Sequence, residues 1–418
     1  MTTSNGAIDT DVLVVGAGPG GAAAAYHLAR HGIDVTIVDK ATFPREKVCG
    51  DGLTPRAVKQ VERMGVDTTD PIFERVEGLR VYSRRVTLEL AWPKLEDFPD
   101  YALVATRSDF DALLARRAEK AGARLLEATE AVSPIVRDGW VTGAMVRPSE
   151  DRDAEPTEIR AKIVFAADGA SSRFAGQAGV KRDASRPLGI AARRYYRTDR
   201  HPGPWFESWL DLWEGDELLP GYGWLFPVAD GTLNLGAGLL NTFKNFKDVS
   251  AQRLFDAFIS MMPADWNIGE ASAEGRILSG PLPMGMNRAP LAVPGLLLIG
   301  DAAGVVSPFN GEGISYAMET GEVAAELAND ALVSGRMGRA MLYPTVLREL
   351  YGSYFTLGRA FAKAIGDPRI MQASTRLMLP NRAVMRFAMR VLANLTDGKD
   401  GDAQDKLIYV VERLAPAS

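Results

Sequence analysis

The first forty residues follow a regular pattern of apolar runs and small side chains. An apolar run from Val12 to Val15 leads into the turn Gly16-Ala17-Gly18-Pro19-Gly20-Gly21, and a second apolar run ends at Asp39. Short apolar runs bounded by glycine are typical of buried strands, and the alanine-rich segment between them has the length of a helix. The pattern therefore predicts strand, tight turn, helix and strand over residues 11–40.

Two later stretches, residues 75–95 and 185–275, alternate polar and apolar side chains, and the second holds five of the seven tryptophans. Alternation with period 2 predicts antiparallel strands with one face against a core or a ligand. The same period places Tyr222, Trp224 and Phe226 on one face of a strand. Plain core and pocket wall are both open for these rings, and the glycines beside them favour the pocket wall.

Helical spacing of apolar residues dominates elsewhere. A stripe within residues 110–114 follows Ser108, which we expect to be the N-cap of that helix. A buried strand from Leu296 to Ile299 precedes a long helix that begins after Gly313. Residues 336–418 are predicted to be a helical C-terminal region.

The turn after the first strand has the spacing of a dinucleotide-binding fingerprint, Gly16-x-Gly18-x-x-Gly21. Gly16 makes the tight turn, Gly18 lets the backbone approach a pyrophosphate, and Gly21 lets the helix lie close to the strand. The helix N-terminus offers free N–H groups and a partial positive charge to the phosphates. Asp39 ends the second strand with a carboxylate suited to ribose hydroxyls. The complete context predicts a bound dinucleotide rather than glycines that serve packing alone.

Composition narrows the class of protein. The chain has 418 residues, 46% hydrophobic and 24% charged, which is typical of a globular protein with two or three domains. A net charge of −5 gives no pull toward nucleic acid, and one cysteine with three histidines leaves neither a disulfide framework nor a metal-ligand cluster. The polar N-terminal segment predicts no secretory signal, and no apolar run reaches the ~18 residues that span a bilayer. We expect a cytoplasmic protein whose membrane contact, if any, is peripheral.

The loop after the second strand carries the only cysteine, Cys49, close to Lys47 and followed by Gly50, Asp51 and Gly52. One interpretation is a surface loop with an incidental small residue. The other is a functional thiol whose pKa is lowered by the lysine and by loop N–H groups. The residues alone leave both open.

Two further strand ends combine aspartate with glycine, at Asp168-Gly169 and at Gly300-Asp301. Small residues there let a loop approach a ligand, although an ordinary exit from a strand explains Asp168 as well. Asp301 is suited to accept hydrogen bonds from a polyol. The helix that begins after Gly311 and Gly313 aims N–H groups at whatever lies in front of it.

Together these motifs resemble the three FAD motifs of the para-hydroxybenzoate-hydroxylase-like flavoproteins. Within that superfamily the chain resembles the geranylgeranyl reductase family, and most closely its bacterial menaquinone reductases, which saturate one isoprene unit of the quinone tail. The segments that carry this second resemblance are Lys47-Val48-Cys49-Gly50-Asp51-Gly52-Leu53-Thr54-Pro55, Gly221-Tyr222-Gly223-Trp224-Leu225-Phe226-Pro227 and Asn310-Gly311-Glu312-Gly313-Ile314.

The resemblance implies FAD as the cofactor and no metal. It places Asp39 at the adenosine ribose, Arg107 at the flavin side, and Asp301 at the ribitol and pyrophosphate. The implied cofactor-binding residues are Gly16, Gly18, Gly21, Asp39, Lys40, Arg107, Asp168, Gly300, Asp301, Gly311 and Gly313. The implied catalytic residues are Cys49, Tyr222 and Trp224.

The implied reaction is reduction of a carbon–carbon double bond in a polyprenyl chain, most closely one isoprene unit of menaquinone. Alternatives are a geranylgeranyl diphosphate or prenyl-lipid reductase, a flavin monooxygenase or halogenase, and a non-enzymatic prenyl-lipid carrier. The stretch Tyr222-x-Trp224-x-Phe226-Pro227 departs from the Trp-x-Trp-x-Ile-Pro pattern of flavin halogenases. No second dinucleotide fingerprint is visible, which leaves the electron donor open.

We therefore predict an α/β fold, α+β overall, in three parts. Residues 8–75, 100–180 and 276–335 form a discontinuous Rossmann-like FAD-binding domain. Residues 76–99 and 181–275 form a mostly antiparallel β-sheet substrate domain, and residues 336–418 form a helical extension.

One helix of that extension places Arg382, Arg386 and Arg390 in a single stripe at i, i+4 and i+8. It is either a helix packed on the FAD domain with a solvated stripe, or a basic amphipathic helix on an anionic membrane. A lipid substrate favours the second interpretation. That interpretation predicts peripheral contact of the C-terminal helices with the inner face of the membrane.

Overall fold

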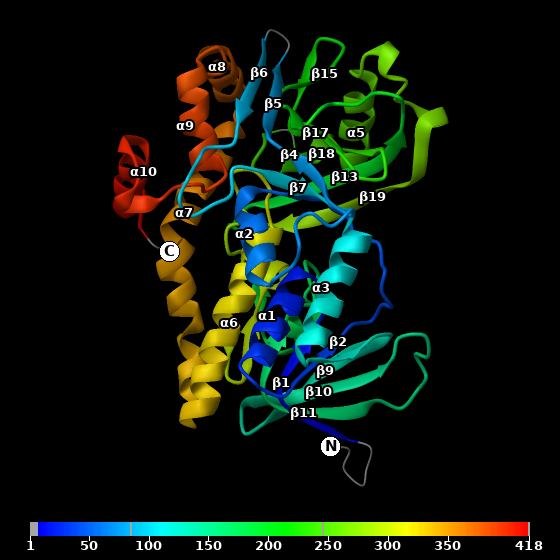
Figure 1. Cartoon of the computed structure of the whole chain (residues 1–418), viewed down its shortest axis with the longest axis vertical. Helices are drawn as coiled ribbons and strands as arrows, with labels where there is room; N and C mark the ends of the chain where they lie inside the picture. The colour runs from blue at the N-terminus through cyan, green and yellow to red at the C-terminus, as the bar shows by residue number, and fades with distance from the viewer. Residues whose placement is uncertain (1–6, 84–85, 245, 417–418) are drawn as a thin grey trace.

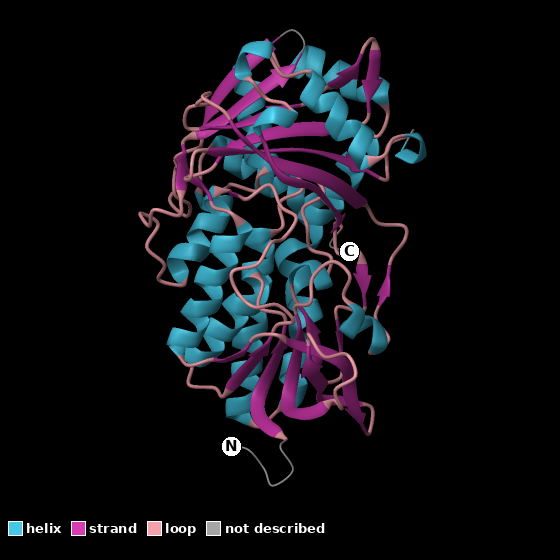
Figure 2. Ribbon diagram, turned by 90° about the vertical axis from the view of Figure 1, so that its right-hand side faces the viewer, coloured by secondary structure: helices cyan, strands magenta, loops and turns pink. Residues whose placement is uncertain are grey.

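The computed structural model describes residues 7–83, 86–244 and 246–416. One sheet lies near the N-terminus, a second lies at the opposite end, and the C-terminal helices run along one side (Figures 1 and 2). Residues 1–6, part of the segment behind the prediction of no secretory signal, lie outside the described residues. So do residues 84–85, which fall within the alternating stretch 75–95.

The first sheet is built around the predicted strand–turn–helix–strand unit. Its strands in spatial order are β21 (Ala292–Val293), β22 (Leu296–Leu298), β11 (Thr157–Ala166), β1 (Ile8–Val15), β2 (Val35–Val38) and β8 (Arg124–Leu126), with β10 (Trp140–Pro148) and β9 (Thr129–Arg137) extending from β11. Strands β22, β11, β1, β2 and β8 run parallel. Their carboxyl ends therefore meet at one edge, where ligands bind in open α/β sheets.

Helices pack against this sheet because their sequences present small or apolar faces to it. These helices are α1 (Pro19–Arg30), α3 (Arg107–Ala121) and α6 (Ile314–Ser334). Helices α1 and α6 contact each other closely, since a Cβ on Gly321 would lie 2.4 Å from the carbonyl oxygen of Gly20. The expected N-cap Ser108 is wrong by two residues. Thr106 caps α3 instead, because its Oγ1 accepts a hydrogen bond of 3.1 Å from the amide of Asp109.

The second sheet has the predicted, mostly antiparallel character. Its order is β19 (Ala273–Pro283), β13 (Leu188–Arg197), β18 (Thr232–Leu240), β17 (Tyr222–Pro227), β14 (Trp205–Trp209), β5 (Gly78–Ser83) and β6 (Val86–Ala91), with β14 and β5 parallel. Residues 276–283 pair with β13 and so lie in this sheet, not with the FAD-binding segments where the sequence placed them. Residues 251–260 are likewise not a strand. They form helix α5 (Ala251–Ser260), which Ser250 caps.

Smaller elements join the two sheets and complete the fold. They are β3 (Gly52–Leu53), β4 (Glu74–Val76) and β7 (Ala102–Val104) in one sheet, the pairs β12 (Lys181–Arg182) with β20 (Arg288–Ala289) and β15 (Leu212–Glu214) with β16 (Glu217–Leu219), and helices α2 (Pro55–Arg63) and α4 (Arg173–Gln177). The predicted fold class, α/β and α+β overall, is confirmed.

The C-terminal region consists of α7 (Tyr343–Ile365), α8 (Pro368–Met378), α9 (Arg382–Leu392) and α10 (Ala403–Leu414). Helix α7 lies beside α6, and α9 lies beside β6 (Figure 1). Met385 and Met389 of α9 are buried in an apolar cluster with Trp92 and Phe206. Within the described residues, no helix is long and apolar enough to cross a bilayer.

Two members of the arginine stripe hold α9 in place. Arg390 forms ion pairs of 2.8 Å with Asp402 and 3.0 Å with Asp405, and so ties α9 to α10. Arg382 donates to the carbonyl oxygen of Glu89 on β6 at 3.2 Å. Both side chains thus serve helix packing, which is closer to the packed-helix interpretation of the stripe.

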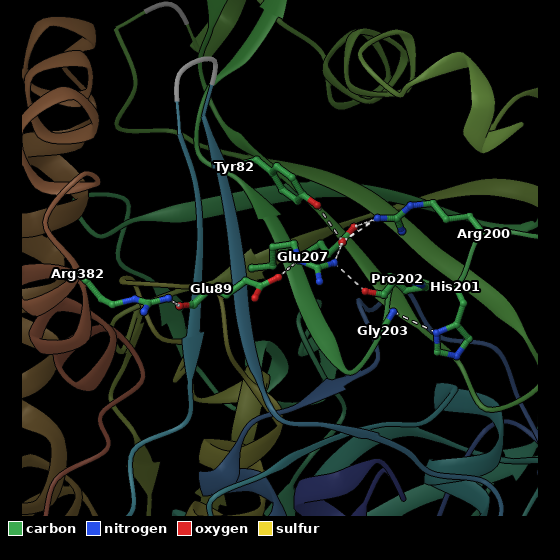
Figure 3. Close-up of polar contacts among 9 residues, drawn as sticks. Tyr82, Glu89, Arg200, His201, Pro202, Gly203, Glu207 and Arg382 are labelled. Atoms are coloured by element: carbon green, nitrogen blue, oxygen red, sulfur yellow. Dashed lines mark hydrogen bonds and ion pairs between the residues drawn. The ribbon is translucent and has the colours of Figure 1, made fainter.

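Figure 3 shows this contact as the end of a longer polar network across β6, β5 and β14. Arg80 pairs with Glu89 at 2.8 Å and with the fully buried Glu207 at 2.6 Å. Glu207 also accepts hydrogen bonds from Tyr82 and Arg200. The Glu207 carboxylate therefore has enough donors to offset the cost of its burial. Through Arg80 it also links β14 and β5 to β6, the edge strand that contacts α9.

Candidate active site

The fingerprint turn has the shape of a phosphate cradle. A Cβ on Gly16 would lie 2.4 Å from the carbonyl oxygen of Ala167, and one on Gly21 would lie 1.8 Å from that of Gly16, so both glycines are required by packing. A Cβ on Gly18 would meet only the end of Arg45, at 3.6 Å, among the described atoms. No described side chain caps the N-terminus of α1. Gly18 and these N–H groups thus leave room and positive potential for a pyrophosphate.

Asp39 lies where the sequence predicts it, at the end of β2 beside this turn. Its carboxylate accepts hydrogen bonds from the amides of Ala17 at 2.8 Å and Ala41 at 2.9 Å, and Arg45 lies 3.6 Å away. The carboxylate therefore also shapes the turn. Its role toward a ribose stays a prediction. Lys40 follows it and is exposed.

Arg107 begins a line of buried charges that runs from this end of the site toward Cys49. Its guanidinium donates to both oxygens of Asp111, at 2.6 and 2.7 Å, and Arg45 lies 3.0 Å from the same carboxylate. The positive charge of Arg107 also acts on Cys49, where it lowers the pKa of the thiol against the effect of burial. The sequence analysis missed Asp111, although its i+4 spacing from Arg107 on a helix was a usable signal.

Asp301 follows strand β22 and lies close to the start of α6. Its Oδ1 lies 3.5 Å from the position of a Cβ on Gly313, the uncapped N-terminal residue of that helix. Burial raises the pKa of Asp301, and the nearby Lys47, Arg107 and Arg288 oppose that rise. Burial in turn lowers the pKa of Lys47.

The carboxylate of Asp168 has hydrogen-bond partners within the protein. It accepts hydrogen bonds from the Ser172 hydroxyl at 3.2 Å and from the amide of Phe174 at 3.1 Å, at the start of α4. These contacts are those of an ordinary exit from a strand. A direct contact of the Asp168 side chain with the cofactor stays a prediction.

The three aromatic rings of β17 lie on one face, as the alternation predicts. The ring centroids of Tyr222 and Trp224 are 5.9 Å apart, and those of Trp224 and Phe226 are 6.4 Å apart. Tyr222 donates to the carbonyl oxygen of Asn310 at 3.3 Å, and a Cβ on Gly311 would lie 2.9 Å from its hydroxyl. The aromatic face thus meets the loop that leads into α6.

The cysteine loop lies against the same face. A Cβ on Gly50 would lie 3.1 Å from Nε1 of Trp224, and one on Gly52 would lie 3.1 Å from Phe226. Both glycines therefore let the loop approach the rings closely, so the loop packs against the protein, and a functional role of its cysteine stays a prediction. Cys49 itself is half-buried between them and Lys47.

The expectation of a lowered thiol pKa is wrong in direction. Burial raises the pKa of Cys49, and the charge of Asp51 adds to the rise. Arg107 opposes both effects, which the sequence could not show because it lies 58 residues later in the chain.

Two residues that sequence reasoning missed, Asn234 and Tyr195, connect these parts. Asn234 accepts a hydrogen bond of 3.1 Å from Nε1 of Trp224 and donates to Oδ2 of Asp51 at 2.7 Å and to the carbonyl oxygen of Cys49 at 3.1 Å. Tyr195 donates to the same oxygen of Asp51 at 2.5 Å. The only signal for this group was the position of Asp51 between two glycines.

Comparison with known proteins agrees with this site. Residues 9–195 match the FAD binding domain family. The menaquinone reductase of Mycobacterium tuberculosis (strain ATCC 25618 / H37Rv) is 36% identical over 393 residues, which cover 94% of this chain and 93% of that protein. The digeranylgeranylglycerophospholipid reductase of Thermoplasma volcanium is 30% identical over 334 residues, which cover 79% of this chain and 81% of that protein.

A solved structure shows the same fold. The crystal structure of a geranylgeranyl bacteriochlorophyll reductase-like protein from Thermoplasma acidophilum has a TM-score of 0.73 to this chain, with 24% sequence identity. The match covers 92% of this chain and 100% of that chain.

The fold and the site define an FAD-dependent oxidoreductase, because the open cradle at Gly18 and the two uncapped helix N-termini fit the pyrophosphate and flavin of FAD. The extent of the sequence matches identifies the family. The chain belongs to the geranylgeranyl reductase family of FAD-dependent oxidoreductases, and the resemblance of its motifs is confirmed.

Proposed function

We propose that the protein saturates one isoprene double bond in the tail of menaquinone. The observation that carries the proposal is the cysteine loop packed beneath the aromatic face of β17, at the end of the FAD site where α6 begins. The similarity to a menaquinone reductase over nearly the whole chain supports this choice among prenyl substrates. The sequence of β17 departs from the halogenase pattern and argues against that alternative.

The chemistry of an isoprene unit explains why such a site is suited to it. The double bond is not conjugated to a carbonyl, so addition of hydride alone would create an unstabilised carbanion. A proton must be added to the less substituted carbon while hydride reaches the tertiary carbon. Bound FAD supplies the hydride in its reduced form. Positive charge then develops on the tertiary carbon and is stabilised by the faces of Trp224 and Tyr222.

The proton donor must lie on this chain or on a water it holds. Cys49 and Tyr222 both carry a proton at neutral pH, since burial raises the pKa of the thiol and raises that of Tyr222 to about 12. Cys49 is the better donor of the two because thiols are intrinsically more acidic. A Cys49→Ala variant is expected to retain FAD and lose most reduction. Unchanged turnover would assign the proton to another group.

We further propose that the C-terminal helices contact an anionic membrane, from which the lipid substrate comes. The support is an apolar stripe on the outer face of α10, formed by the exposed side chains Leu407, Val410, Val411 and Leu414. These residues have the i, i+3, i+4, i+7 spacing of one helix face, yet they point to solvent instead of the core. The exposed Lys406 and Arg413 flank the stripe. Apolar residues with basic neighbours are typical of helices that lie on lipid surfaces.

A cleft lies beside this region of the surface. It has a volume of about 460 Å³ and lies between β6, α9 and α10, with Trp92, Met389 and Arg386 among its lining residues. Trp92 packs edge-on against Phe206 at 6.0 Å, and Phe206 lies 4.3 Å from Phe226. A row of apolar rings thus connects the lining of the cleft with the aromatic face, and we propose that the prenyl chain approaches Cys49 from this side.

Vesicle sedimentation tests the membrane proposal. Leu407→Asp with Val411→Asp is expected to release the protein from vesicles of anionic phospholipid, and added salt is expected to weaken the binding of the wild type. The matched control is Val136→Asp, because Val136 on β9 is 55% exposed and Leu407 is 53% exposed. Equal binding of all variants would contradict the proposal. Concentration-dependent dimerisation lost in the double variant would assign the stripe to a second copy of the chain.

The substrate proposal is tested by mass spectrometry of prenyl lipids in cells with and without the gene product. Menaquinone that is heavier by two hydrogen atoms is expected only when the protein is present. A change confined to prenyl diphosphates or to phospholipids would instead identify one of those as the substrate. Absence of any change would contradict the assignment as a prenyl reductase.

A further inference from the structure

Asp51 is a fully buried carboxyl with uneven surroundings. Its Oδ2 accepts two hydrogen bonds, from Tyr195 at 2.5 Å and from Asn234 at 2.7 Å. Its Oδ1 has no hydrogen-bond partner among the described residues. The backbone φ of Asp51 is +68°, a left-handed conformation that glycine would adopt more easily. An acidic residue at this position costs free energy twice, through backbone strain and through a buried oxygen without a hydrogen bond. Its presence therefore points to a functional role.

We propose that Asp51 and Tyr195 form a proton relay that returns a proton to Cys49 after each reduction. The proposal rests on the proposed function, in which Cys49 protonates the double bond. Asn234 bridges Oδ2 of Asp51 to the carbonyl oxygen of Cys49. The side chain of Asp51 and the backbone of Cys49 are thus held by one amide, and the charge of Asp51 raises the pKa of the Cys49 thiol.

The surroundings of Asp51 suit a group that gains and loses a proton near neutral pH. Burial raises the pKa of Asp51 to about 6, against the opposing effects of Tyr195, Arg193, Asn234 and Arg107. These groups come from β13, β18 and α3, the elements packed around the loop. Cys49 is the remaining titratable group beside it.

Tyr195 connects Asp51 to the outside of the protein. It is half-buried, and the guanidinium of Arg193 lies 4.3 Å from the centre of its ring. Arg193 pairs at 2.8 Å with Glu46, whose side chain is 59% exposed. Arg193 therefore fixes the tyrosine in position, and the proposed relay takes its solvent proton through this half-buried side chain.

Protons are conserved over one turnover of the relay. The S–H bond of Cys49 breaks as a C–H bond forms at the less substituted carbon, and the cofactor supplies the hydride, as above. The Asp51 carboxylate accepts the Tyr195 hydroxyl proton at Oδ2 as that hydroxyl takes one from water. The carboxyl so formed gives its proton to the thiolate, which restores both the carboxylate and the thiol. Each turnover thus consumes one proton from solvent, and the residues return to their starting state.

Alkylation of the thiol tests the link without any turnover, because Cys49 is the only cysteine in the chain. The rate of reaction of the FAD-loaded protein with iodoacetamide is measured against pH. Asp51→Asn keeps the shape of the side chain but removes its negative charge, so the thiol pKa is expected to fall and alkylation at pH 7 to accelerate at least threefold. Glu207→Gln is the matched control, since it alters another buried carboxylate that accepts from a tyrosine. Identical profiles for Asp51→Asn and the wild type would overturn the link.

Turnover tests the relay itself. Asp51→Asn and Tyr195→Phe are each expected to lower kcat at least tenfold with little change in KM. Each is also expected to abolish the solvent deuterium isotope effect on kcat that arises from return of the proton to Cys49. FAD content should match that of Glu207→Gln. Unchanged kcat in both variants would overturn the relay. If the wild type reduces no prenyl substrate while the alkylation profiles still differ, the proposed function fails and the proton link between Asp51 and Cys49 stands.

Discussion

Nε1 of Trp224 donates a hydrogen bond of 3.1 Å to Oδ1 of Asn234, whose amide nitrogen holds Asp51 and the carbonyl of Cys49. The indole is therefore more than a wall of the pocket, because it orients the amide that positions the cysteine loop. Loss of this bond leaves a buried acceptor unsatisfied, which costs about 1–3 kcal/mol.

Trp224→Phe is accordingly expected to lower kcat roughly tenfold, since 1.4 kcal/mol corresponds to a factor of ten. KM for the lipid should change much less, because the ring itself remains. Phe226→Leu serves as the control, since it alters packing on the same face and removes no hydrogen bond. Steady-state kinetics of both variants make the comparison. An effect of Trp224→Phe confined to KM would reduce the indole to a pocket wall.

Gly18 tests the position of the cofactor. Its φ of −69° is accessible to any residue, and a Cβ there meets only the end of Arg45 at 3.6 Å among the described atoms. Gly18→Val is therefore expected to leave the fold of the protein intact and to lower bound FAD at least tenfold, measured by flavin absorbance after gel filtration. Gly338→Val is the control, since no described atom lies within 4 Å of a Cβ at that position. Full FAD occupancy in Gly18→Val would show that the pyrophosphate lies elsewhere.

The buried pair of Arg107 and Asp111 predicts a loss of stability. Arg107→Ala leaves the fully buried Asp111 with Arg45 as its remaining cationic partner. Removal of one member of a buried pair costs about 3–5 kcal/mol, and we expect the lower end of this range because Arg45 remains. Urea unfolding measures the change. The double variant Arg107→Ala with Asp111→Ala should recover part of it, and a loss below about 1 kcal/mol in the single variant would contradict the pairing.

Asp51 predicts a pH dependence of stability with a defined sign. Its pKa is raised to about 6 in the folded chain, above the value of about 3.9 for an unfolded one. Between these two values the folded state binds more protons, so the contribution of Asp51 to stability is present at low pH and is lost as pH rises to about 6. The difference of two units corresponds to about 3 kcal/mol.

Asp51→Asn should remove this dependence. The free energy of unfolding of Asp51→Asn relative to the wild type is expected to increase from about pH 4 to about pH 7, as measured by urea unfolding across that range. Glu207→Gln again provides the control. A difference that does not vary with pH would mean that Asp51 is charged throughout.

Local patterns predicted the elements that carry the cofactor. Glycine spacing and apolar runs were enough for the turn at Gly16–Gly21, and period-2 alternation was enough for the shared face of Tyr222, Trp224 and Phe226. Both features depend on neighbours within a few residues. The start of α6 after Gly313 was predictable for the same reason.

The chemistry around Cys49 depends on distant partners and was not predictable. Tyr195 and Asn234 lie 144 and 183 residues from Asp51 in the chain, and only the register of β13, β18 and β17 brings them together. The lowered pKa of Cys49, one of two interpretations left open by the sequence, is not found, because burial outweighs the charges adjacent in sequence. The arginine stripe likewise found its partners, Asp402 and Asp405, on a later helix.

The most direct test of the account is in vitro reduction of menaquinone by the purified protein. The FAD-loaded protein is reduced chemically in ordinary water under exclusion of oxygen and mixed with menaquinone in deuterated water. A single turnover is recorded that is faster than the exchange of the flavin N5 hydrogen with solvent, and the product is analysed by mass spectrometry with fragmentation of the tail. The account predicts a gain of two hydrogen atoms in one isoprene unit, with solvent deuterium at the less substituted carbon, and little product from Cys49→Ala. An unchanged tail, or solvent deuterium at the tertiary carbon, would contradict it.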